Sequence, residues 1–228
     1  MDIKPTRHGF RLSQHGVVIS ELRASPGPTH SVFDVLAALI ATFLPAGRVG
    51  VLGFAGGGMM APLRCLEVNS VIDSVDLDRS GYKLFRQYCP EWTKFVNWEQ
   101  ADAVTWLREQ PPEFDMLVED LSVPVNGDVF KPSISWNILP ELIHRRLRPK
   151  GIAVFNLMLP PGRRWNSEVG RIAGLFPTAR IVRLDEFENR ILVTGHSVPS
   201  ARNMGALLRR QLHRLRSRQA SRLQVQTV

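Results

Sequence analysis

The sequence is poor in cysteine and contains no long apolar segment. Its two cysteines, Cys65 and Cys89, match the spacing of no metal or redox motif, so we expect no disulfide framework. No stretch approaches the roughly 18 to 20 consecutive apolar residues that a membrane helix needs. The segment from Met1 to Ser20 also lacks the apolar core of a secretory signal. These absences predict a protein of the reducing cytoplasm without a transmembrane segment.

Acidic residues are absent from the end of the chain. Residues 198–228 contain seven arginines and neither aspartate nor glutamate. Since the whole chain has 29 Lys and Arg against 21 Asp and Glu, the preceding part carries 22 and 21 and is nearly neutral. Most of the net charge of +8 therefore lies in this segment, and such an asymmetry concerns partners rather than fold.

Apolar residues recur in this basic segment at three- and four-residue spacing, at Ala201, Met204, Leu208, Leu212 and Leu215. The pattern predicts a basic amphipathic helix. Its apolar face is expected to pack on the domain or on a second copy of the chain, as in a homodimer. The alternative is an anionic partner, either nucleic acid or a membrane surface. The segment has no aromatic residue for base stacking, which argues against single-strand recognition.

Short apolar runs alternate with helical patterns over most of the chain. With 228 residues, of which 44% are hydrophobic, the chain is long enough for one sizeable domain. Strands are expected at residues 49–54, 71–77, 93–98, 114–120, 152–158, 179–184 and 190–195. Helices are expected at residues 32–43, 56–66, 80–88, 103–109, 134–147 and 165–176. The last two strands have no helix between them.

This order predicts an α/β fold with a Rossmann-like, doubly wound, seven-stranded and mostly parallel sheet that has one antiparallel strand. Residues 9–22 are expected to form a short N-terminal β-hairpin. We divide the chain into a β-hairpin region at 1–28, the Rossmann-like domain at 29–197 and the basic C-terminal helix or tail at 198–228. In such sheets ligands bind at the carboxyl ends of the strands, so the residues after each strand are the most informative.

Glycines and a carboxylate follow the first two strands. Gly53, Gly56, Gly57 and Gly58 lie between a strand and a helix, where a flexible turn and free N–H groups let the backbone approach a ligand. Asp76 ends the second strand about twenty residues later, where nucleotide-binding folds bind ribose hydroxyls. The alternatives are a tight turn for the glycines and a capping or surface role for the aspartate.

Carboxylates also follow the third and fourth strands. Asp102 is placed to accept a hydrogen bond from an exocyclic amine such as that of adenine, or to cap the helix that begins at Ala103. Glu119 and Asp120 end an apolar strand, where burial is costly unless they have partners, and only one of them can face the crevice. The segment 121–133 after them is a candidate lid. The alternative is a structural acid that pairs with an arginine.

Two tryptophans, Trp136 and Trp165, begin predicted helices near the crevice. Core packing is the favoured interpretation, and lining an acceptor pocket is the alternative. No cluster of His, Cys and Asp has the spacing of metal ligands, so we expect no metal site.

At these strand ends the chain resembles the fold of S-adenosylmethionine-dependent methyltransferases and, within it, the spermidine synthase (polyamine aminopropyltransferase) branch, over residues 9–195. The matching residues are His30 of a Tyr/His/Glu motif, Gly53, Gly57 and Gly58 of the glycine loop, Asp76, Asp102-Ala103, and Asp120, Ser122 and Pro124 of the catalytic loop. The resemblance implies S-adenosylmethionine or its decarboxylated form as cofactor. It implies cofactor binding by Gly53, Ala55, Gly56, Gly57, Gly58, Asp76, Leu77, Asp102, Ala103 and His30, with Asp120 as the catalytic residue.

Two positions depart from the family pattern. Gly56 stands where the family has an aspartate that holds the amine of decarboxylated S-adenosylmethionine. Val123 stands where a second aspartate helps to bind the polyamine. The resemblance therefore implies a retained nucleoside half and an eroded polyamine half, since carboxylates are what hold cationic amines.

Three hypotheses follow. The first is a methyltransferase with an unknown small-molecule acceptor, in which Asp120 is a base or an orienting hydrogen-bond acceptor. The second is an aminopropyltransferase in which Glu119, Asp128 or Asp185 supplies the missing charge. The third is a non-catalytic member that keeps the fold, and with it the nucleoside site, for binding or interaction.

Overall fold

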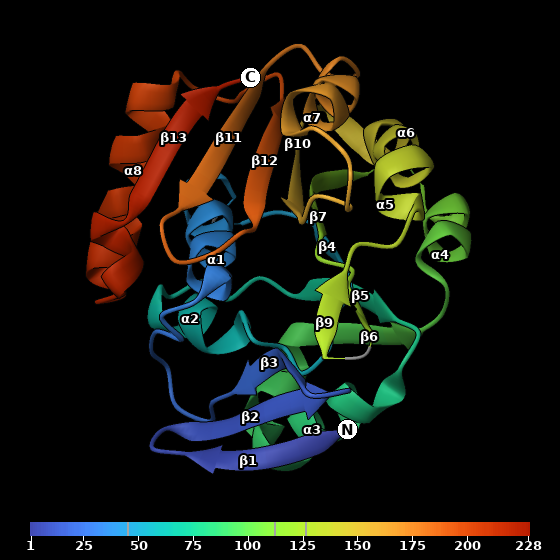
Figure 1. Ribbon diagram of the computed structural model, residues 1–228. Helices are drawn as coiled ribbons and strands as arrows, with labels where there is room; N and C mark the ends of the chain where they lie inside the picture. Colours follow the sequence, from blue (N-terminus) through green and yellow to red (C-terminus); the bar gives the residue numbers. More distant parts are fainter. Residues whose placement is uncertain (45, 112, 126) are drawn as a thin grey trace.

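The computed structural model describes residues 1–44, 46–111, 113–125 and 127–228. Over this part of the chain the central sheet has eight strands in the order β13-β11-β12-β10-β7-β4-β5-β6 (Figure 1). Five neighbouring strands are parallel, namely β6 (Val96–Gln100), β5 (Ile72–Asp76), β4 (Val49–Leu52), β7 (Phe114–Glu119) and β10 (Leu147–Leu157). The Rossmann-like α/β architecture predicted from the sequence is confirmed.

The other end of the sheet is antiparallel. β12 (Arg190–Gly195) pairs antiparallel with β10 and with β11 (Ala179–Leu184), and β11 pairs antiparallel with β13 (Leu223–Thr227). The predicted count of seven strands with one antiparallel was therefore wrong by one strand. The extra strand comes from the arginine-rich tail, where apolar and polar residues alternate with a period of two that the helical interpretation overlooked.

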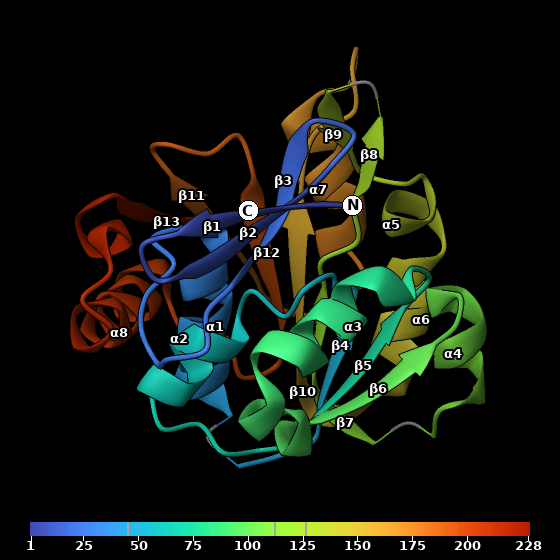
Figure 2. The same cartoon turned by 90° about the horizontal axis from the view of Figure 1, so that it is seen from below.

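Helices cover both faces of the sheet. α1 (Val32–Phe43), α2 (Met60–Cys65), α3 (Arg79–Tyr88) and α8 (Ala201–Arg214) share one apolar core, and α4 (Ala103–Glu109), α6 (Leu139–Arg146) and α7 (Trp165–Ala173) share the other. In β4 the neighbours Val51 and Leu52 are buried in different cores, because successive side chains of a strand point to opposite faces. Figure 2 shows α1, α2 and α8 on one side of the sheet and α4 and α6 on the other.

The predicted strand 93–98 begins later than expected. A 3-10 helix, η1 (Pro90–Phe95), precedes β6. Pro90 begins this turn, and the Thr93 hydroxyl donates a hydrogen bond of 2.7 Å to the Pro90 carbonyl oxygen. A proline favours the first position of a helical turn because its missing N–H is not needed there.

The predicted helix 134–147 is divided into α5 (Ile134–Asn137) and α6. Pro140 lies in the first turn of α6, where its fixed φ suits a helix start but does not suit a helix interior. Leu147 then begins β10 instead of ending the helix.

The N-terminal segment forms a small antiparallel sheet of β1 (Asp2–Thr6), β2 (Gly9–Gln14) and β3 (Val17–Leu22). The predicted hairpin is β2–β3, to which β1 is added. Leu12 and Leu22 anchor the sheet, since both are buried in the core that contains α1. In Figure 1 this sheet lies at the bottom of the view, below the central sheet.

The candidate lid contains a second small hairpin, β8 (Val123–Val125) and β9 (Asp128–Phe130). Asn126, which is part of the predicted lid, lies outside the described residues. The Gly127 N–H donates a hydrogen bond of 3.0 Å to the His15 carbonyl oxygen, so the hairpin meets the turn between β2 and β3. The two hairpins together cover the crevice side of the sheet. Movement of this segment as a lid stays a prediction.

The basic tail packs on the domain. Three apolar side chains of α8, Met204, Leu208 and Leu212, are fully buried in the core shared with α1. A 3-10 helix, η2 (Arg218–Ser221), then leads into β13. Packing of the amphipathic helix on its own domain is confirmed, whereas a homodimer and an anionic partner stay predictions. Searching the described part of the chain finds no helix with the length and apolar character needed to cross a membrane.

Candidate functional site

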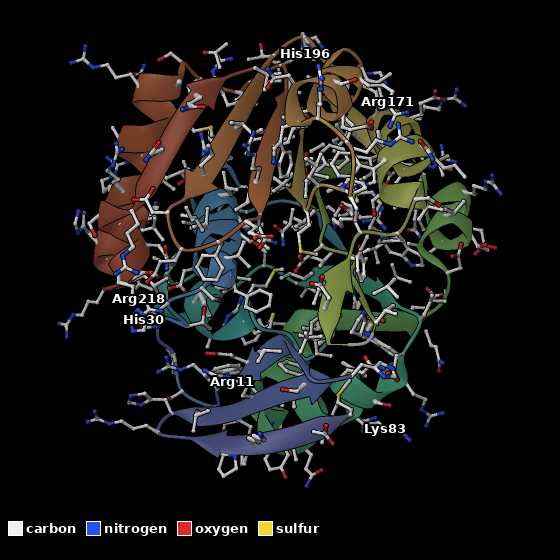
Figure 3. The ribbon with its side chains drawn as sticks, in the orientation of Figure 1. Arg11, His30, Lys83, Arg171, His196 and Arg218 are labelled. Carbon is white, nitrogen blue, oxygen red and sulfur yellow. The ribbon has the colours of Figure 1, made fainter. Side chains whose placement is uncertain are left out.

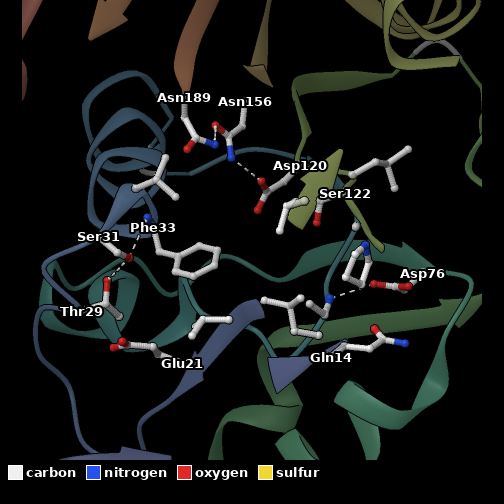
Figure 4. A pocket seen from close by; sticks show the side chains of 18 of the residues that line it. Gln14, Glu21, Thr29, Ser31, Phe33, Asp76, Asp120, Ser122, Asn156 and Asn189 are labelled. Atoms are coloured by element: carbon white, nitrogen blue, oxygen red, sulfur yellow. Dashed lines mark hydrogen bonds between the residues drawn. The ribbon is translucent and has the colours of Figure 1, made fainter. Parts of the chain in front are cut away.

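The carboxyl ends of the central strands open into a cavity of about 860 Å³, which we call the main cavity (Figure 4). Residues of the N-terminal sheet and of the β8–β9 hairpin also line it. The predicted site residues that line it are His30, Gly53, Ala55, Asp76, Leu77, Asp102, Ala103 and Asp120. One cavity therefore brings together residues from the ends of several strands, as the fold leads us to expect.

The glycine turn is a place of close backbone approach. Gly53 has a φ of +91°, and a Cβ at this position would lie 2.8 Å from the carbonyl oxygen of Asp120. Glycine is the residue that tolerates both the positive φ and this close approach of the Asp120 backbone. Gly56, Gly57 and Gly58 are buried and are not among the residues that line the main cavity. In the structure these three glycines allow the turn to pack tightly beneath the cavity.

Asp76 supports this turn. Its Oδ2 accepts hydrogen bonds from the N–H groups of Phe54 (3.0 Å) and Ala55 (2.8 Å), and its Oδ1 accepts one from the N–H of Asp78 (3.0 Å). Each carboxylate oxygen has about two lone-pair positions, so Oδ1 can still accept a ribose hydroxyl. The structural and the ligand-binding interpretations of Asp76 are therefore compatible.

Asp102 caps α4. Its Oδ1 accepts hydrogen bonds of 3.0 Å from the N–H groups of both Val104 and Thr105. In the described part of the chain no hydrogen bond engages its Oδ2, and the residue lines the main cavity. Leu77, in the same wall, exposes 67% of its surface. A free carboxylate oxygen and an exposed apolar side chain together suit the amine and the ring face of an adenine.

Asp120 is the carboxylate at the centre of the site. Its Oδ1 accepts a hydrogen bond of 2.7 Å from the Asn156 side-chain amide (Figure 4). The side-chain oxygen of Asn156, Oδ1, in turn accepts a hydrogen bond of 3.1 Å from the side-chain amide of Asn189. This chain of amides orients the carboxylate in the cavity.

Burial raises the pKa of Asp120 to about 6, because the charged form loses hydration. Lys131 and the Asn156 hydrogen bond oppose the rise in pKa, and the negative charges of Glu119 and Asp76 add to it. A carboxylate with this pKa is ionised at neutral pH and is a stronger base than an ordinary aspartate, which suits proton abstraction.

Sequence reasoning missed both asparagines. Asn156 interrupts an apolar strand near its carboxyl end, and a polar residue at such a place is a usable signal. Asn189 gave no signal beyond its place in a turn, because only the folded chain brings the β11–β12 turn over the end of β10.

Glu119 points away from the main cavity, as predicted for one of two adjacent carboxylates. It is fully buried and forms an ion pair of 2.8 Å with Lys131, and the Ser135 hydroxyl donates to it at 2.8 Å. The partner is therefore a lysine and not the arginine that we had considered. Lys131 also donates to the Leu121 carbonyl oxygen at 2.6 Å, so it anchors the base of the β8–β9 hairpin.

His30 is held by the C-terminal tail, and Figure 3 shows it beside Arg218. The Arg218 N–H donates to His30 Nδ1 at 3.4 Å, and the Gln219 side-chain amide donates to the His30 carbonyl oxygen at 2.8 Å. Acceptance at Nδ1 places the ring proton of the neutral imidazole on Nε2. Arg218 also lines the main cavity, so the tail contributes to the site, which the sequence did not indicate.

The two departures from the family pattern have a structural correlate. A Cβ at Gly56 would lie 2.4 Å from Cδ1 of Leu12, a fully buried side chain of the N-terminal sheet. Leu12 therefore occupies the space that a side chain at position 56 would need. Val123 lines the main cavity with 44% of its surface exposed, so an apolar group is presented where the family has a carboxylate.

A second cavity of about 750 Å³, the side cavity, adjoins the main one. The two share the lining residues Val129, Met158, Phe187 and Asn189. Trp165 lines the side cavity, whereas Trp136 is buried in the core. Within the described ranges no group of three or more His, Cys, Asp or Glu is placed to hold a metal ion.

Comparison with solved structures shows the fold. A probable spermidine synthase from Corynebacterium glutamicum ATCC 13032 superposes with a TM-score of 0.75 at 18% identity, covering 99% of this chain and 86% of the other. Human methyltransferase-like protein 13 in complex with SAH superposes with a TM-score of 0.61 at 19% identity, covering 82% of this chain and 92% of the other. Spermidine synthase from Thermotoga maritima superposes with a TM-score of 0.61 at 14% identity, covering 82% of this chain and 66% of the other. No family model and no curated protein sequence matches the chain.

Proposed function

We propose that the main cavity binds S-adenosylmethionine or its decarboxylated form and that the chain is a transferase, most simply a methyltransferase, acting on a small acceptor. The observation that carries this proposal is the convergence of Asp76, Asp102 and Asp120 on one cavity beside the Gly53 turn. The similar fold of a methyltransferase-like protein in complex with SAH and of a spermidine synthase in complex with the analogue AdoDATO supports it.

The residues present fit the nucleoside half of such a cofactor. Asp76 Oδ1 would accept from the ribose, and Asp102 Oδ2 would accept from the adenine amine. Leu77 would cover a face of the ring, and the glycine turn would let the backbone approach the methionine end. When bound, the sulfonium supplies an electrophilic carbon whose bond to sulfur breaks with the electron pair remaining on sulfur.

The chain itself supplies a base and an orienting network. Asp120 is placed to take the proton of an acceptor N–H or O–H group as that group forms its new bond to carbon. Asn156 holds Oδ1 at 2.7 Å and thereby leaves Oδ2 for the proton. Residues of the N-terminal sheet and of the β8–β9 hairpin line the cavity around this carboxylate. Holding the two reactants in line would lower the barrier to such a transfer.

Two features support the intact cofactor in this proposal rather than the decarboxylated one. Leu12 fills the space beside Gly56, so no carboxylate stands there to hold a free amine. An apolar Val123 likewise supports an acceptor other than a polyamine. Glu119 does not supply the missing charge, because it is buried and paired with Lys131.

Aminopropyl transfer is the second candidate. The observation in its favour is that Asp128 and Asp185 line the side cavity, which adjoins the main cavity that Asp120 lines. These two carboxylates would then hold a cationic acceptor in place of the lost aspartates. A non-catalytic, nucleoside-binding or interaction module is the third candidate, for a chain that binds the nucleoside without turnover.

Calorimetric titration of the full chain tests the proposal. The ligands are S-adenosylmethionine, its demethylated product SAH, decarboxylated S-adenosylmethionine and methylthioadenosine. Tighter binding of the first pair supports a methyltransferase, and tighter binding of the second pair supports an aminopropyltransferase. Absence of binding for all four contradicts both enzymatic proposals.

A further inference from the structure

Two arginines lie directly opposite each other on neighbouring strands. Arg183 of β11 and Arg190 of β12 are register partners, so their side chains stand on the same face of the sheet. Like charges that face each other in this way repel. Among the ion pairs of the described residues, none joins either arginine to a carboxylate. Both guanidinium groups therefore remain without a direct ion-pair partner among the described residues.

Both arginines line the side cavity. The guanidinium carbon of Arg190 lies 4.3 Å from the centroid of the Trp165 ring, and Arg183 is exposed. Stacking on an aromatic ring fixes the plane of a guanidinium and leaves its N–H edge available to a ligand. Burial, and then the neighbouring charge of Arg183, lower the pKa of Arg190, which agrees with repulsion between the two groups.

The side cavity is connected to the proposed base. Asn189 precedes Arg190 in the chain and lines both cavities. Its side chain donates to Asn156, which donates to Asp120. A molecule that reaches from the arginine pair to Asp120 would thus remain within two adjoining spaces.

Other charged residues line the side cavity without pairing with either arginine in the described part of the chain. Asp128, Asp185 and Glu188 also line it. All three are exposed, and none forms an ion pair with the two arginines among the described residues. A further cation of the lining, Arg163, is already paired with Glu168 at 3.2 Å. The two free guanidinium groups are therefore the groups best suited to bind an anion.

We propose that Arg183 and Arg190 bind an anionic group of the acceptor substrate, a carboxylate or a phosphate. This rests on the proposed function. A planar guanidinium matches the two oxygens of such a group. The acceptor would then carry an anion at one end and a nucleophilic N–H or O–H at the other. Its nucleophile bonds to the transferred carbon, its proton passes to Asp120, and the electron pair of the broken carbon–sulfur bond stays on sulfur.

An NMR titration of the full chain tests this inference, with inorganic phosphate and succinate as separate probes. The proteins are the wild type, Arg183→Gln, Arg190→Gln and a control, Arg202→Gln, which removes the same charge from an exposed site on α8. We expect saturable shifts in the wild type with at least one probe and at least tenfold weaker binding in either cavity variant. The control should bind like the wild type. The tighter probe identifies phosphate or carboxylate.

Two results would overturn the inference: no saturation with either probe, or equal affinity in the wild type and Arg183→Gln. Arg183 is exposed, so its variant remains informative even where Arg190→Gln loses packing against Trp165. SAH titration of the same proteins separates this inference from the proposed function. Phosphate or succinate binding without SAH binding contradicts the proposed function alone, and SAH binding without either anion contradicts the anion site alone.

Discussion

The side-chain amide of Asn156 donates a hydrogen bond of 2.7 Å to Oδ1 of Asp120, and this contact joins the ends of β10 and β7 at the centre of the cavity. It stabilises the ionised carboxylate in a place where burial disfavours charge. The pKa of Asp120 nevertheless remains raised, at about 6, because loss of hydration is the larger effect. Asp120 is therefore a costly residue for the folded state, and this cost can be measured without any substrate.

Replacing Asp120 by asparagine should stabilise the protein at neutral and alkaline pH. The folded-state pKa of about 6 lies above the ordinary value of 3.8, so the penalty is fully present above pH 6 and vanishes below about pH 4. Allowing for partial exposure, we expect Asp120→Asn to gain about 1 to 2 kcal/mol at pH 8. Urea unfolding of both proteins at pH 8 and pH 4 checks this. A loss of stability at pH 8 would contradict it.

Activity should fall as the pH drops through about 6, since only the ionised Asp120 can accept a proton. In Asn156→Ala the hydrogen bond that lowers the Asp120 pKa is lost, so the acid limb of the profile should move to higher pH. The pH dependence of kcat/KM, measured as SAH release with a responsive acceptor, checks both. An unmoved acid limb would show that Asn156 does not act through the carboxylate.

Gly53→Ala should destabilise the chain and disturb the site. The added Cβ meets the Asp120 carbonyl oxygen at 2.8 Å, and the φ of +91° is strained for alanine. We expect a cost of about 2 to 4 kcal/mol. Gly170→Ala is the matched control, because Gly170 lies within α7 and a Cβ there meets nothing within 4 Å. The control should gain about 0.5 to 1 kcal/mol. Equal unfolding midpoints for the two variants would refute the close-approach argument.

Lys131→Met should be strongly destabilising. It leaves Glu119 fully buried without its cation, which typically costs about 3 to 5 kcal/mol. Adding Glu119→Gln should recover most of the loss, because the amide can still accept from Ser135 without carrying a charge. Chemical unfolding of the two single variants and the double variant measures this coupling. Simple additivity of the two effects would contradict the buried-pair interpretation.

The sequence was sufficient for the architecture where periodicity was strong. Buried apolar runs predicted β4 and β7. The ends of β5, β6 and β7 place Asp76, Asp102 and Asp120 in one cavity. The sequence was insufficient for β13. Its apolar and polar residues alternate as in a strand, but the arginine-rich segment and the helical pattern just before it favoured a helix or tail. The sequence also could not reveal the Asn156–Asn189 contact or the Arg183–Arg190 pair, which depend on strand register.

The site also shows why a residue type alone left alternatives open. Asp102 caps a helix with Oδ1, and its Oδ2 accepts no hydrogen bond from the described residues. The cap is therefore confirmed, and the adenine contact stays a prediction. From the sequence, Gly56 was interpreted as part of a flexible turn and, through the family resemblance, as the place of a missing aspartate. The structure supplies the physical reason, which is that Leu12 of the N-terminal sheet occupies the space.

Calorimetric titration with SAH of the wild type and of Asp102→Asn tests nucleoside binding, the central claim, most directly. Asparagine caps a helix about as well as aspartate, so the thermal midpoint should stay within about two degrees of the wild type. Loss of the carboxylate that we propose accepts from the adenine amine should weaken SAH binding about tenfold or more. Asp128→Asn, on the exposed hairpin, is the control for charge. Saturable binding that weakens only in Asp102→Asn is the predicted result, and no binding by the wild type, or equal binding by all three proteins, would contradict the account.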